Sequence, residues 1–546
     1  MRLFWLAFAF AVLFAAPALA AKQLQEYSGP VQTAPPANTK RYPVSGSVVN
    51  SVTNEPIARA LVNISGAQGQ LAAFTGADGR FQFAEVAEGF TSVSAQRPGF
   101  FDACSLSFSP TCGNGQQHRV GPGVNDFRLA LTPASKISGR VRDSDGEPVE
   151  GLQIVITGQQ IMNGRKQWNN RGSASTEDDG TYRLSEQQPG PIVVCTVSRP
   201  VAQFAGEASE VYAPRCFPNG TDFSSAQVID LPAGQEARAD FTVSTVRGFT
   251  IRGVIAGAQG QMGVNEWVEG PGGMQDHVGA FGMRPATGQF AIRGIPNGAW
   301  KFHFQTNDGQ GKVSEATEEV AINGADVSGL QITLKRGIDI PVQINQGQST
   351  AGQTAPQNGA AQVRLVSVGD PGSRQYYSSQ MPGQSESGAP PPLSIQSVQP
   401  GTYKVFAQPF GNGCTGSIYY GTTDLAREPL TISADAPPQM LTVNLRNDCA
   451  TLAVTVHADS RDTQGMLVVL ADAPFMEPQL LGFQPNSASA SVNLSPGAYH
   501  IYALSDLNGI EYANPEAMRA YPSETVTLEP HAQKSIAVEL TGLNGR

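Results

Sequence analysis

The feature that most constrains this chain is a turn-and-strand pattern that returns about every 100 residues, the usual size of a β-sandwich. In each copy a glycine-centred turn precedes a strand with alternating apolar residues, as in "QPGTYKVFAQ" and "SPGAYHIYAL". The turn glycines are Gly89, Gly190, Gly298, Gly401 and Gly497. A second alternating strand, such as "DFRLALTP" from Asp126, ends each copy. Two independent landmarks with one period predict a tandem array of five modules.

The composition supports an all-β fold. The 546 residues include 59 Gly and 39 Pro, which suits turn-rich sheets better than long helices. We expect Ig-like antiparallel β-sandwiches, with a single helical turn near Asn514–Tyr521. Module 4 carries long loops rich in Gln, Gly and Pro. The predicted segments are 1–20 (signal peptide), 21–41 (flexible leader) and, for modules 1–5, 42–133, 134–247, 248–336, 337–447 and 448–546.

Two related stretches mark tight turns in modules 1 and 2. They read "TGADGRFQF" and "TEDDGTYRL", and in both an Asp-Gly pair precedes an alternating aromatic strand. Asp-Gly is a preferred sequence of the type I′ hairpin turn, because glycine accepts a positive φ and aspartate tolerates it. We expect the aromatic side chains Phe81 and Phe83 to face a core. The predicted turn residues are Asp78, Gly79, Asp179 and Gly180.

The first twenty residues predict export. The segment "MRLFWLAFAFAVLFAAPALA" combines Arg2, a long apolar run and an A-x-A site that ends at Ala20. This is the pattern of a cleaved secretory signal, and no later stretch is apolar for long enough to span a bilayer. We therefore expect a secreted or periplasmic chain with no membrane span after signal cleavage.

The chain has six cysteines, an even number that favours disulfides in an exported protein. The alternative is that the cysteines are reduced and buried. Proximity in the sequence favours the pairs Cys104–Cys112, Cys195–Cys216 and Cys414–Cys449.

Modules 1 and 2 share further motifs: a strand with a Ser-Gly pair, a Glu-Pro step, and a β-branched strand that ends in glycine. On these motifs Val44–Phe100 and Ile137–Pro200 resemble the carboxypeptidase regulatory-like domain. Module 3 resembles it in part, and modules 4 and 5 only in spacing. The resemblance implies a transthyretin-like sandwich from a superfamily that includes starch-binding-like folds. It also implies accessory roles, namely binding, adhesion or spacing, and no catalytic residue.

The sequence lacks the motifs of several enzyme classes. None of the six histidines has a glutamate three residues on, so the H-x-x-E zinc site of carboxypeptidases is not supported. No nucleophile elbow, P-loop or dinucleotide-binding glycine motif occurs. Net charge is −10 and no Lys/Arg block appears, which argues against nucleic-acid binding. We expect no enzyme activity, no metal and no cofactor, although a glycosidase-type carboxylate pair stays open.

Aromatic residues among amides are the best candidates for a ligand site, since sugar rings stack on aromatic faces. Trp168 in "NGRKQWNNRGS" is the strongest candidate, and we expect it in a loop. The alternative is that Trp168 covers the end of its own sandwich. Trp300 follows a repeat turn and should be core. The candidate ligand-binding residues are Trp168, Asn169, Asn170, Trp267, Tyr376 and Tyr377.

The resulting hypothesis is a non-enzymatic exported binding protein that takes a polysaccharide or a cell-surface protein. The first alternative is a structural spacer or assembly scaffold without a small ligand. A third and weaker alternative is an unrecognised hydrolase.

Overall fold

The structure is a computed structural model of the chain. The predicted signal peptide, nearly all of the leader and Cys112 lie outside the residues that it describes. Those residues are 40–67, 69–106, 116–123, 125–162, 164–201, 210–256, 264–270, 275–276, 280–307, 313–346, 361–368, 376–378, 393–410, 413–433, 436–457, 465–473, 476–483, 489–507 and 509–542.

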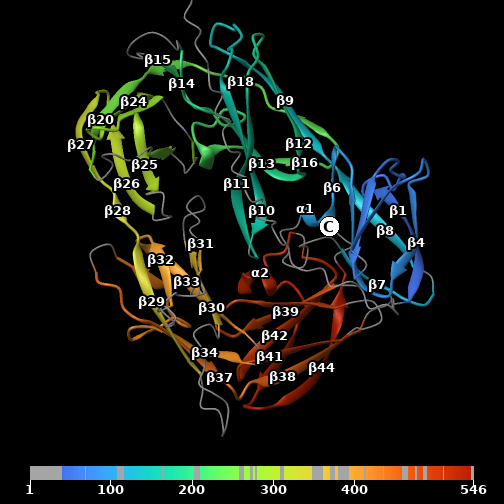
Figure 1. Ribbon diagram of the computed structural model, residues 1–546. Helices are drawn as coiled ribbons and strands as arrows, with labels where there is room; N and C mark the ends of the chain where they lie inside the picture. The colour runs from blue at the N-terminus through green and yellow to red at the C-terminus, as the bar shows by residue number, and fades with distance from the viewer. Residues whose placement is uncertain are drawn as a thin grey trace, which may run out of the picture.

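Five hydrophobic cores follow one another along the chain. Each draws its buried residues from one consecutive segment, and these segments are Val44–Leu131, Ile137–Val243, Phe249–Ile332, Ile340–Leu445 and Ala450–Val538. The cores support the five-module division, whose boundaries we keep as a proposal. Figure 1 shows the modules following a curved path, so that module 5 returns beside strands β10 and β11 of module 2.

Module 1 consists of two four-stranded sheets, ordered β4-β1-β8-β6 and β3-β2-β5-β7. Its elements are β1 (Arg41–Asn50), β2 (Leu61–Gly66), β3 (Gly69–Phe74), β4 (Arg80–Ala87), β5 (Gly89–Gln96), β6 (Phe100–Phe101), α1 (Ala103–Leu106), β7 (Gln116–Val120) and β8 (Asp126–Pro133).

Module 2 repeats this plan with sheets β12-β9-β17 and β11-β10-β13-β16, and adds the small sheet β14-β15-β19. Its elements are β9 (Ser135–Arg142), β10 (Gln153–Met162), β11 (Arg165–Ser175), β12 (Thr181–Gln187), β13 (Gly190–Thr196), β14 (Arg199–Pro200), β15 (Glu210–Tyr212), the 3-10 turn η2 (Phe223–Ser225), β16 (Ile229–Leu231), β17 (Glu236–Arg238), β18 (Phe241–Thr242) and β19 (Thr245–Arg247).

Modules 3 and 4 are also built from two sheets each: β23-β24-β20-β27 with β22-β21-β25-β26-β28, and β32-β29-β37-β34-β35 with β31-β30-β33-β36. The strands of module 3 are β20 (Phe249–Ala256), β21 (Asn265–Glu269), β22 (Gln275–Asp276), β23 (Ala280–Arg284), β24 (Gln289–Ile295), β25 (Gly298–Asn307), β26 (Val313–Ile322), β27 (Val327–Thr333) and β28 (Lys335–Arg336). Those of module 4 are β29 (Ile338–Gln346), β30 (Ala361–Ser367), β31 (Tyr376–Ser378), β32 (Ser394–Val398), β33 (Gly401–Pro409), β34 (Cys414–Tyr420), β35 (Thr423–Asp424), β36 (Leu430–Ile432) and β37 (Leu441–Arg446).

In module 5 the strands join into a single sheet, β40-β39-β42-β44-β38-β41, with β43 also paired to β42. Its elements are β38 (Ala450–His457), β39 (Gly465–Ala471), β40 (Gln479–Phe483), β41 (Ser489–Leu494), β42 (Gly497–Leu504), α2 (Pro515–Met518), β43 (Glu524–Leu528) and β44 (Gln533–Thr541). In every module the first long strand also pairs in parallel with a closing strand, as β1 does with β8.

The glycine of the opening strand has a packing role that recurs in modules 1 to 3, as Gly46, Gly139 and Gly253, and in the first two modules it belongs to the Ser-Gly pair. A Cβ atom on Gly46 would lie 2.4 Å from the ring of Phe81, and one on Gly139 would lie 2.7 Å from the ring of Tyr182. Phe81 and Phe83 are buried, as predicted from the alternation. The aromatic strand after the turn therefore packs directly on the glycine of the first strand, which ties these two sequence motifs together.

The Asp-Gly turns differ from the predicted type I′ hairpins. Gly79 has φ +71°, but Asp78 is not among the positive-φ residues, whereas a type I′ turn needs both. The N–H of Gly79 donates to the carbonyl of Gly76 (3.0 Å), and the Asp78 carboxylate accepts from the N–H of Arg80 (3.1 Å). The turn carries the chain from one sheet to the other, β3 to β4, so the twist-matched hairpin geometry is not needed here.

The helices are short. The predicted helical turn is present as α2, with Asn514 as its N-cap, but the expectation of a single turn was wrong because α1 and η2 also form. Among the residues that the structure describes, no helix has both the length and the apolar character that crossing a bilayer requires.

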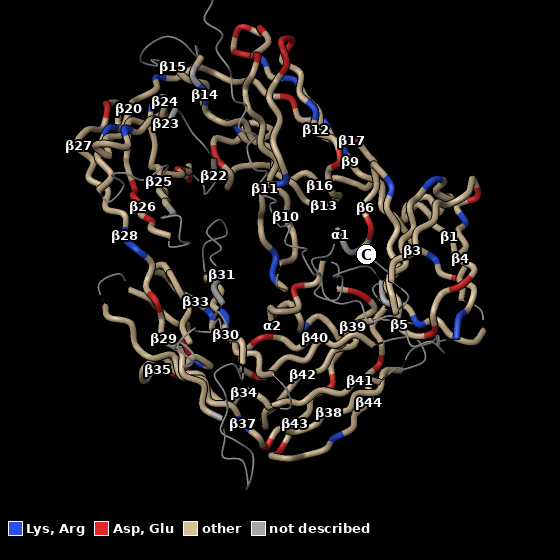
Figure 2. Tube along the Cα trace, in the orientation of Figure 1, with Lys and Arg blue, Asp and Glu red and all other residues tan. Residues whose placement is uncertain are grey.

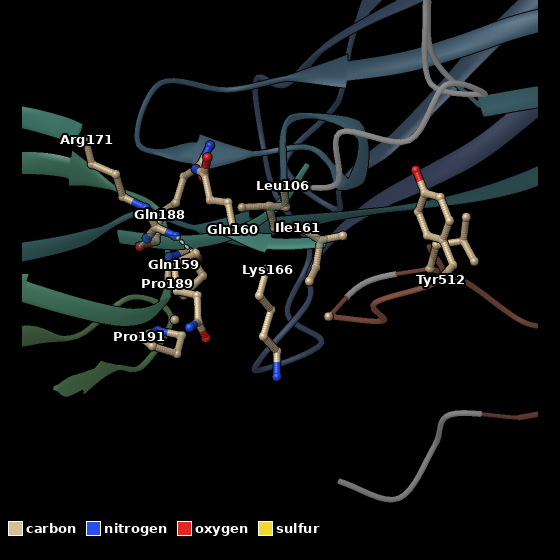
Figure 3. Close-up of a pocket in the computed structure, with 13 residues that line it drawn as sticks. Leu106, Gln159, Gln160, Ile161, Lys166, Arg171, Gln188, Pro189, Pro191 and Tyr512 are labelled. Atoms are coloured by element: carbon tan, nitrogen blue, oxygen red, sulfur yellow. Dashed lines mark hydrogen bonds between the residues drawn. The ribbon is translucent and has the colours of Figure 1, made fainter. Parts of the chain in front are cut away.

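The β10–β11 hairpin of module 2 reaches module 5. The N–H of Ala513 donates to the carbonyl of Gly164 at the hairpin tip (2.9 Å), and Nζ of Lys166 lies 3.5 Å from Oε1 of Glu511. Ile161 packs against an apolar group on module 5 that includes Tyr512. Figure 3 shows Ile161 and Lys166 on the hairpin, opposite Tyr512. Figure 2 shows that basic and acidic residues are interspersed over the described trace. Two modules that lie far apart in the sequence are therefore in direct contact.

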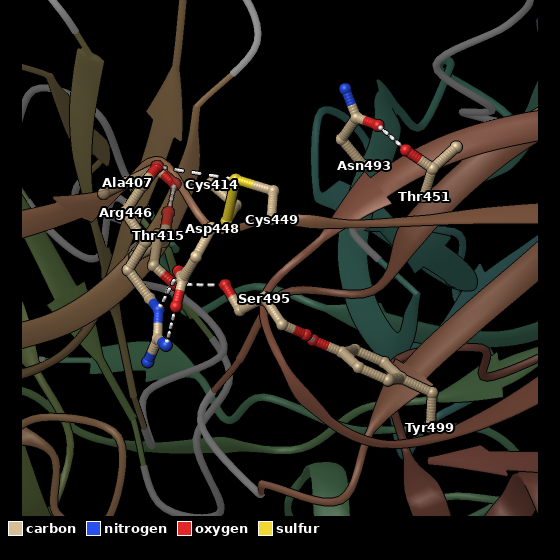
Figure 4. Close-up of a disulfide and its surroundings, with 10 residues drawn as sticks. All are labelled: Ala407, Cys414, Thr415, Arg446, Asp448, Cys449, Thr451, Asn493, Ser495 and Tyr499. Atoms are coloured by element: carbon tan, nitrogen blue, oxygen red, sulfur yellow. Dashed lines mark hydrogen bonds and ion pairs between the residues drawn. A yellow bond between two sulfur atoms is a disulfide. The ribbon is translucent and has the colours of Figure 1, made fainter. Parts of the chain in front are cut away.

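Modules 4 and 5 are joined covalently. Cys414 of β34 forms a disulfide with Cys449, immediately before β38. Beside it, the Ser495 hydroxyl donates to the carbonyl of Thr415, and the Tyr499 hydroxyl donates to the carbonyl of Ser495 (2.7 Å) (Figure 4). This joint fixes the start of module 5 against module 4.

Candidate functional site

The structure places Trp168 in strand β11, not in the expected loop. The reason is the length of the β10–β11 pairing, in which Trp168 lies opposite Gln159. Its indole packs on the Cys195–Cys216 disulfide, and its ring meets the Phe223 ring edge-on at 5.4 Å between centroids. Trp168 is therefore half-buried against its own module, which agrees with the alternative that it covers part of the sandwich.

The amide side chains beside Trp168 interact with other residues of the same hairpin. Nδ2 of Asn169 lies 3.3 Å from the sulfur of Met162, and Oδ1 of Asn170 accepts from the N–H of Gly172 (2.7 Å). Their first structural role is therefore to support the end of β10 and the bend of β11.

Trp267 lies on the face of β21 that points away from the core of module 3. Its ring stacks on the imidazole of His303, with centroids 5.0 Å apart and planes 4° from parallel. Glu269 is 3.4 Å from Nζ of Lys301 on the same face. Trp300, by contrast, is buried in the core as predicted. One face of the Trp267 indole is thus already covered by His303.

The remaining candidates do not complete a common site. Tyr376 and Tyr377 belong to β31, but their side chains lie outside the described part of the structure. Trp168 and Trp267 belong to separate sheets of separate modules. In the described residues no group of three or more His, Cys, Asp or Glu side chains is placed to hold a metal ion.

A surface that was not predicted from the sequence lies on module 1. It is the outward face of sheet β3-β2-β5-β7, which we call the module 1 platform. Two large aromatic side chains are exposed on it, Phe74 (69%) and Phe90 (61%). The described platform residues are Leu61, Asn63, Ser65, Gln70, Ala72, Phe74, Phe90, Ser92, Ser94, Gln96 and Arg119.

Strand alternation explains why these residues share one face. Val62 and Ile64 of β2 are fully buried in the core, so their neighbours Leu61, Asn63 and Ser65 point outward. In the register Leu61 lies opposite Phe74 on β3 and opposite Gln96 on β5. Phe90 lies six residues before Gln96, so the two exposed rings are separated by about 20 Å along the strands.

The platform is almost uncharged. Arg119 is its one charged residue among those described, and its guanidinium lies 6.0 Å above the Phe90 ring in a cation–π contact. The sequence signal that could have identified this surface is the position of its two aromatic residues in the strand alternation. Phe74 and Phe90 alternate with the apolar, core-facing residues of their strands, so both occupy outward-facing positions.

Comparison with known proteins bears on module 1 in particular. Residues 43–116 match the family model of the carboxypeptidase regulatory-like domain. The match does not extend to module 2, where the resemblance stays a prediction. No curated protein matches the chain.

Solved structures align with parts of the chain at low identity. The TIE protein of Bacillus anthracis aligns at 12% identity over 54% of this chain and 51% of that one (TM-score 0.17), so the chain spans about half of its length. A minor pilin of Streptococcus agalactiae aligns at 10% identity over 38% of this chain and 96% of that one, with a TM-score of 0.21. The shaft pilin SpaA of Lactobacillus rhamnosus GG aligns at 10% identity over 38% of this chain and 98% of that one, with a TM-score of 0.19. TM-scores this low carry no argument about ligands or assembly.

The fold of the chain is thus an all-β array of sandwich modules, as predicted, and its segment 43–116 matches the carboxypeptidase regulatory-like domain.

Proposed function

We propose that this chain is an exported, non-enzymatic binding protein whose module 1 platform holds an extended, uncharged polysaccharide. The observation that carries the proposal is the pair Phe74 and Phe90, exposed at opposite ends of a sheet face whose other described residues are mostly polar. Export is supported by the signal-like segment 1–20 and by the disulfides Cys195–Cys216 and Cys414–Cys449.

The chemistry of the platform favours a neutral glycan. Hydroxyl and amide side chains such as Ser94, Asn63 and Gln96 can both donate to and accept from sugar hydroxyls. The apolar C–H faces of a pyranose ring stack on aromatic faces such as those of Phe74 and Phe90. Only one cation lies on the described platform, and it is already engaged with a ring, so an acidic polymer would find little charge to neutralise.

The test is retention of the purified chain on insoluble polysaccharides of differing linkage, supplemented by a glycan array. We expect saturable retention on at least one neutral polysaccharide. The double variant F74A/F90A should lose at least about tenfold in affinity, because two stacking contacts disappear. Both side chains are exposed, so the variant should remain folded.

The matched control is Val52→Ala. Val52 is another exposed apolar side chain of module 1 (56%), but it lies in the β1–β2 connection, off the platform. Its retention should equal that of the unmodified chain. Equal retention of F74A/F90A would remove the platform from the proposal. Failure of the unmodified chain to bind any glycan would leave the structural spacer as the better account.

A further inference from the structure

Arg171 is placed in module 2 by two local irregularities. It is the extra residue of a β-bulge between β10 and β11, since the pairing passes from Ile156↔Gly172 to Thr157↔Asn170. Bulges often re-aim a side chain beside a functional site. On the neighbouring strand, a Cβ atom at Gly158 would lie 1.8 Å from Nε of Arg171. The bulge and the glycine together make room for one guanidinium.

The guanidinium has only neutral acceptors. Nη1 donates to the carbonyl of Gln188 (2.9 Å) and Nη2 to the carbonyl of Gln159 (2.7 Å). Nε is buried without a hydrogen-bond partner, and among the described residues no carboxylate pairs with this side chain. Burial lowers the pKa of Arg171. A partly buried cation is usually accompanied by an anion, and the residues that the structure describes do not supply one.

Arg171 lines a cavity where modules 1, 2 and 5 meet (Figure 3). The cavity has a volume of about 460 Å³, within the range of small-molecule sites. Its apolar walls include Leu106 of module 1, Ile161 of module 2 and Leu507 of module 5. Of its described lining residues, Lys166 and Arg171 are basic and none is acidic. Glu511, which precedes the lining residue Tyr512, is engaged with Lys166.

We propose that this cavity binds a small organic carboxylate, with Arg171 as the anchor for the carboxylate group. The planar guanidinium still has N–H groups to donate, and arginine recognises carboxylates through paired hydrogen bonds. The side chain of Gln188 is fixed by Nε2 of Gln160 (2.8 Å) and by the carbonyl of Ser105 (3.0 Å), which orients the amide wall around the anchor. The body of the ligand contacts the apolar walls.

The position of the cavity gives this site a second property. Its walls come from three modules, so the ligand binds the assembled arrangement better than separated modules. Binding therefore stabilises the contact between the β10–β11 hairpin and module 5 by mass action. This site is independent of the module 1 platform.

The experiment is calorimetric titration of the full exported chain with two acids and their neutral analogues. Benzoate is compared with benzyl alcohol, and glucuronate with glucose, so that the body of the ligand is distinguished from its charge. We expect at least one acid to bind and to raise the thermal unfolding temperature, while its neutral analogue does neither. Equal binding of an acid and its neutral analogue overturns the proposal, and so does the absence of binding by both acids.

The anchor is tested by Arg171→Gln, which should weaken binding of the acid about 10- to 100-fold. The matched control is Arg183→Gln, another arginine of module 2, exposed and paired with Glu236 outside the cavity. It should bind like the unmodified chain. If Arg171→Gln does not fold, Arg171→Lys keeps the charge but loses the paired geometry, and should retain weaker, still charge-selective binding. Unchanged affinity in whichever variant folds overturns the proposal.

Discussion

Modules 1 and 2 use equivalent sheet faces in opposite ways. In module 1 the outward positions of β5 hold Ser92, which is buried, and Ser94, which is half-buried, while Phe90 and Gln96 at the two ends of the strand are exposed. At the equivalent positions of β13, module 2 has Val193 and Cys195, both buried. There a segment held by the Cys195–Cys216 disulfide covers the face, and Trp168 completes the cover. The equivalent face of the sandwich is therefore partly exposed in module 1 and covered in module 2.

The corresponding hairpins of modules 1 and 2 differ in length. Strands β2 and β3 of module 1 have 6 residues each, whereas β10 and β11 of module 2 have 10 and 11. The extra length carries the hairpin of module 2 beyond its own core, to the contact with module 5. Module 2 therefore has a covered face and a hairpin that contacts module 5, whereas we propose that module 1 binds its ligand through the platform.

The largest expected effect comes from removing the cover of module 2. The double variant C195S/C216S opens a loop closed over a sequence separation of 21 residues, which should reduce the free energy of unfolding by roughly 3 kcal/mol. Urea unfolding followed by tryptophan fluorescence measures this, since Trp168 loses its packing partner. Module 1 should keep its stability and its retention on polysaccharide. Loss of retention in this variant would contradict the separation of the two roles.

A reciprocal pair of substitutions tests the equivalence of the faces. Val193→Ser buries a hydroxyl at a site only 2% exposed and should cost about 2 kcal/mol. Ser94→Val on the open platform should change stability by less than about 0.5 kcal/mol. Chemical denaturation of both variants gives the comparison. Similar costs at the two positions would mean that the platform of module 1 is covered as well.

Much of this architecture could be predicted because it depends on local chemistry. The period, the buried Phe81 and Phe83, the core position of Trp300 and the helical turn within Asn514–Tyr521 all follow from alternation and turn residues. Two of the three expected cysteine pairs, those outside Cys104–Cys112, are present as disulfides.

The site was harder to predict because it depends on register and on contacts distant in the sequence. The Asn-rich surroundings of Trp168 suggested a loop, but pairing with β10 overrides that local preference. Phe74 and Phe90 look like core residues until the register shows which phase faces outward. The bulge at Arg171 follows from a one-residue mismatch between two strands, which neither strand reveals alone.

The contact at the hairpin tip can be isolated with two glycines of module 2. Gly164 and Gly146 both have positive φ (+72° and +88°), but a Cβ at Gly164 would lie 2.6 Å from N of Ala513, whereas one at Gly146 meets nothing within 4 Å. Gly146→Ala should cost about 1 kcal/mol of backbone strain. Gly164→Ala should cost more and should also separate the hairpin from module 5, which small-angle scattering would detect as expansion. Equal costs without expansion would show that the tip contact is not held in solution.

The smallest expected effect concerns the like charges where the hairpin approaches module 4, because Lys404 is only half-buried and solvent screens its charge. Burial, with a smaller contribution from Arg165 at the hairpin tip, lowers the pKa of Lys404 to about 8. The unfolded chain keeps a lysine pKa near 10.4, so between about pH 8 and 10 it binds a proton that the folded state has released. The free energy of unfolding should therefore rise with pH across this window. Lys404→Met should remove that rise, and the difference between the two chains in urea unfolding from pH 7.5 to 9.5 measures it. Parallel pH profiles of the two chains would mean that Lys404 is solvated. They would also mean that the hairpin tip lies farther from Lys404 than it lies from module 5.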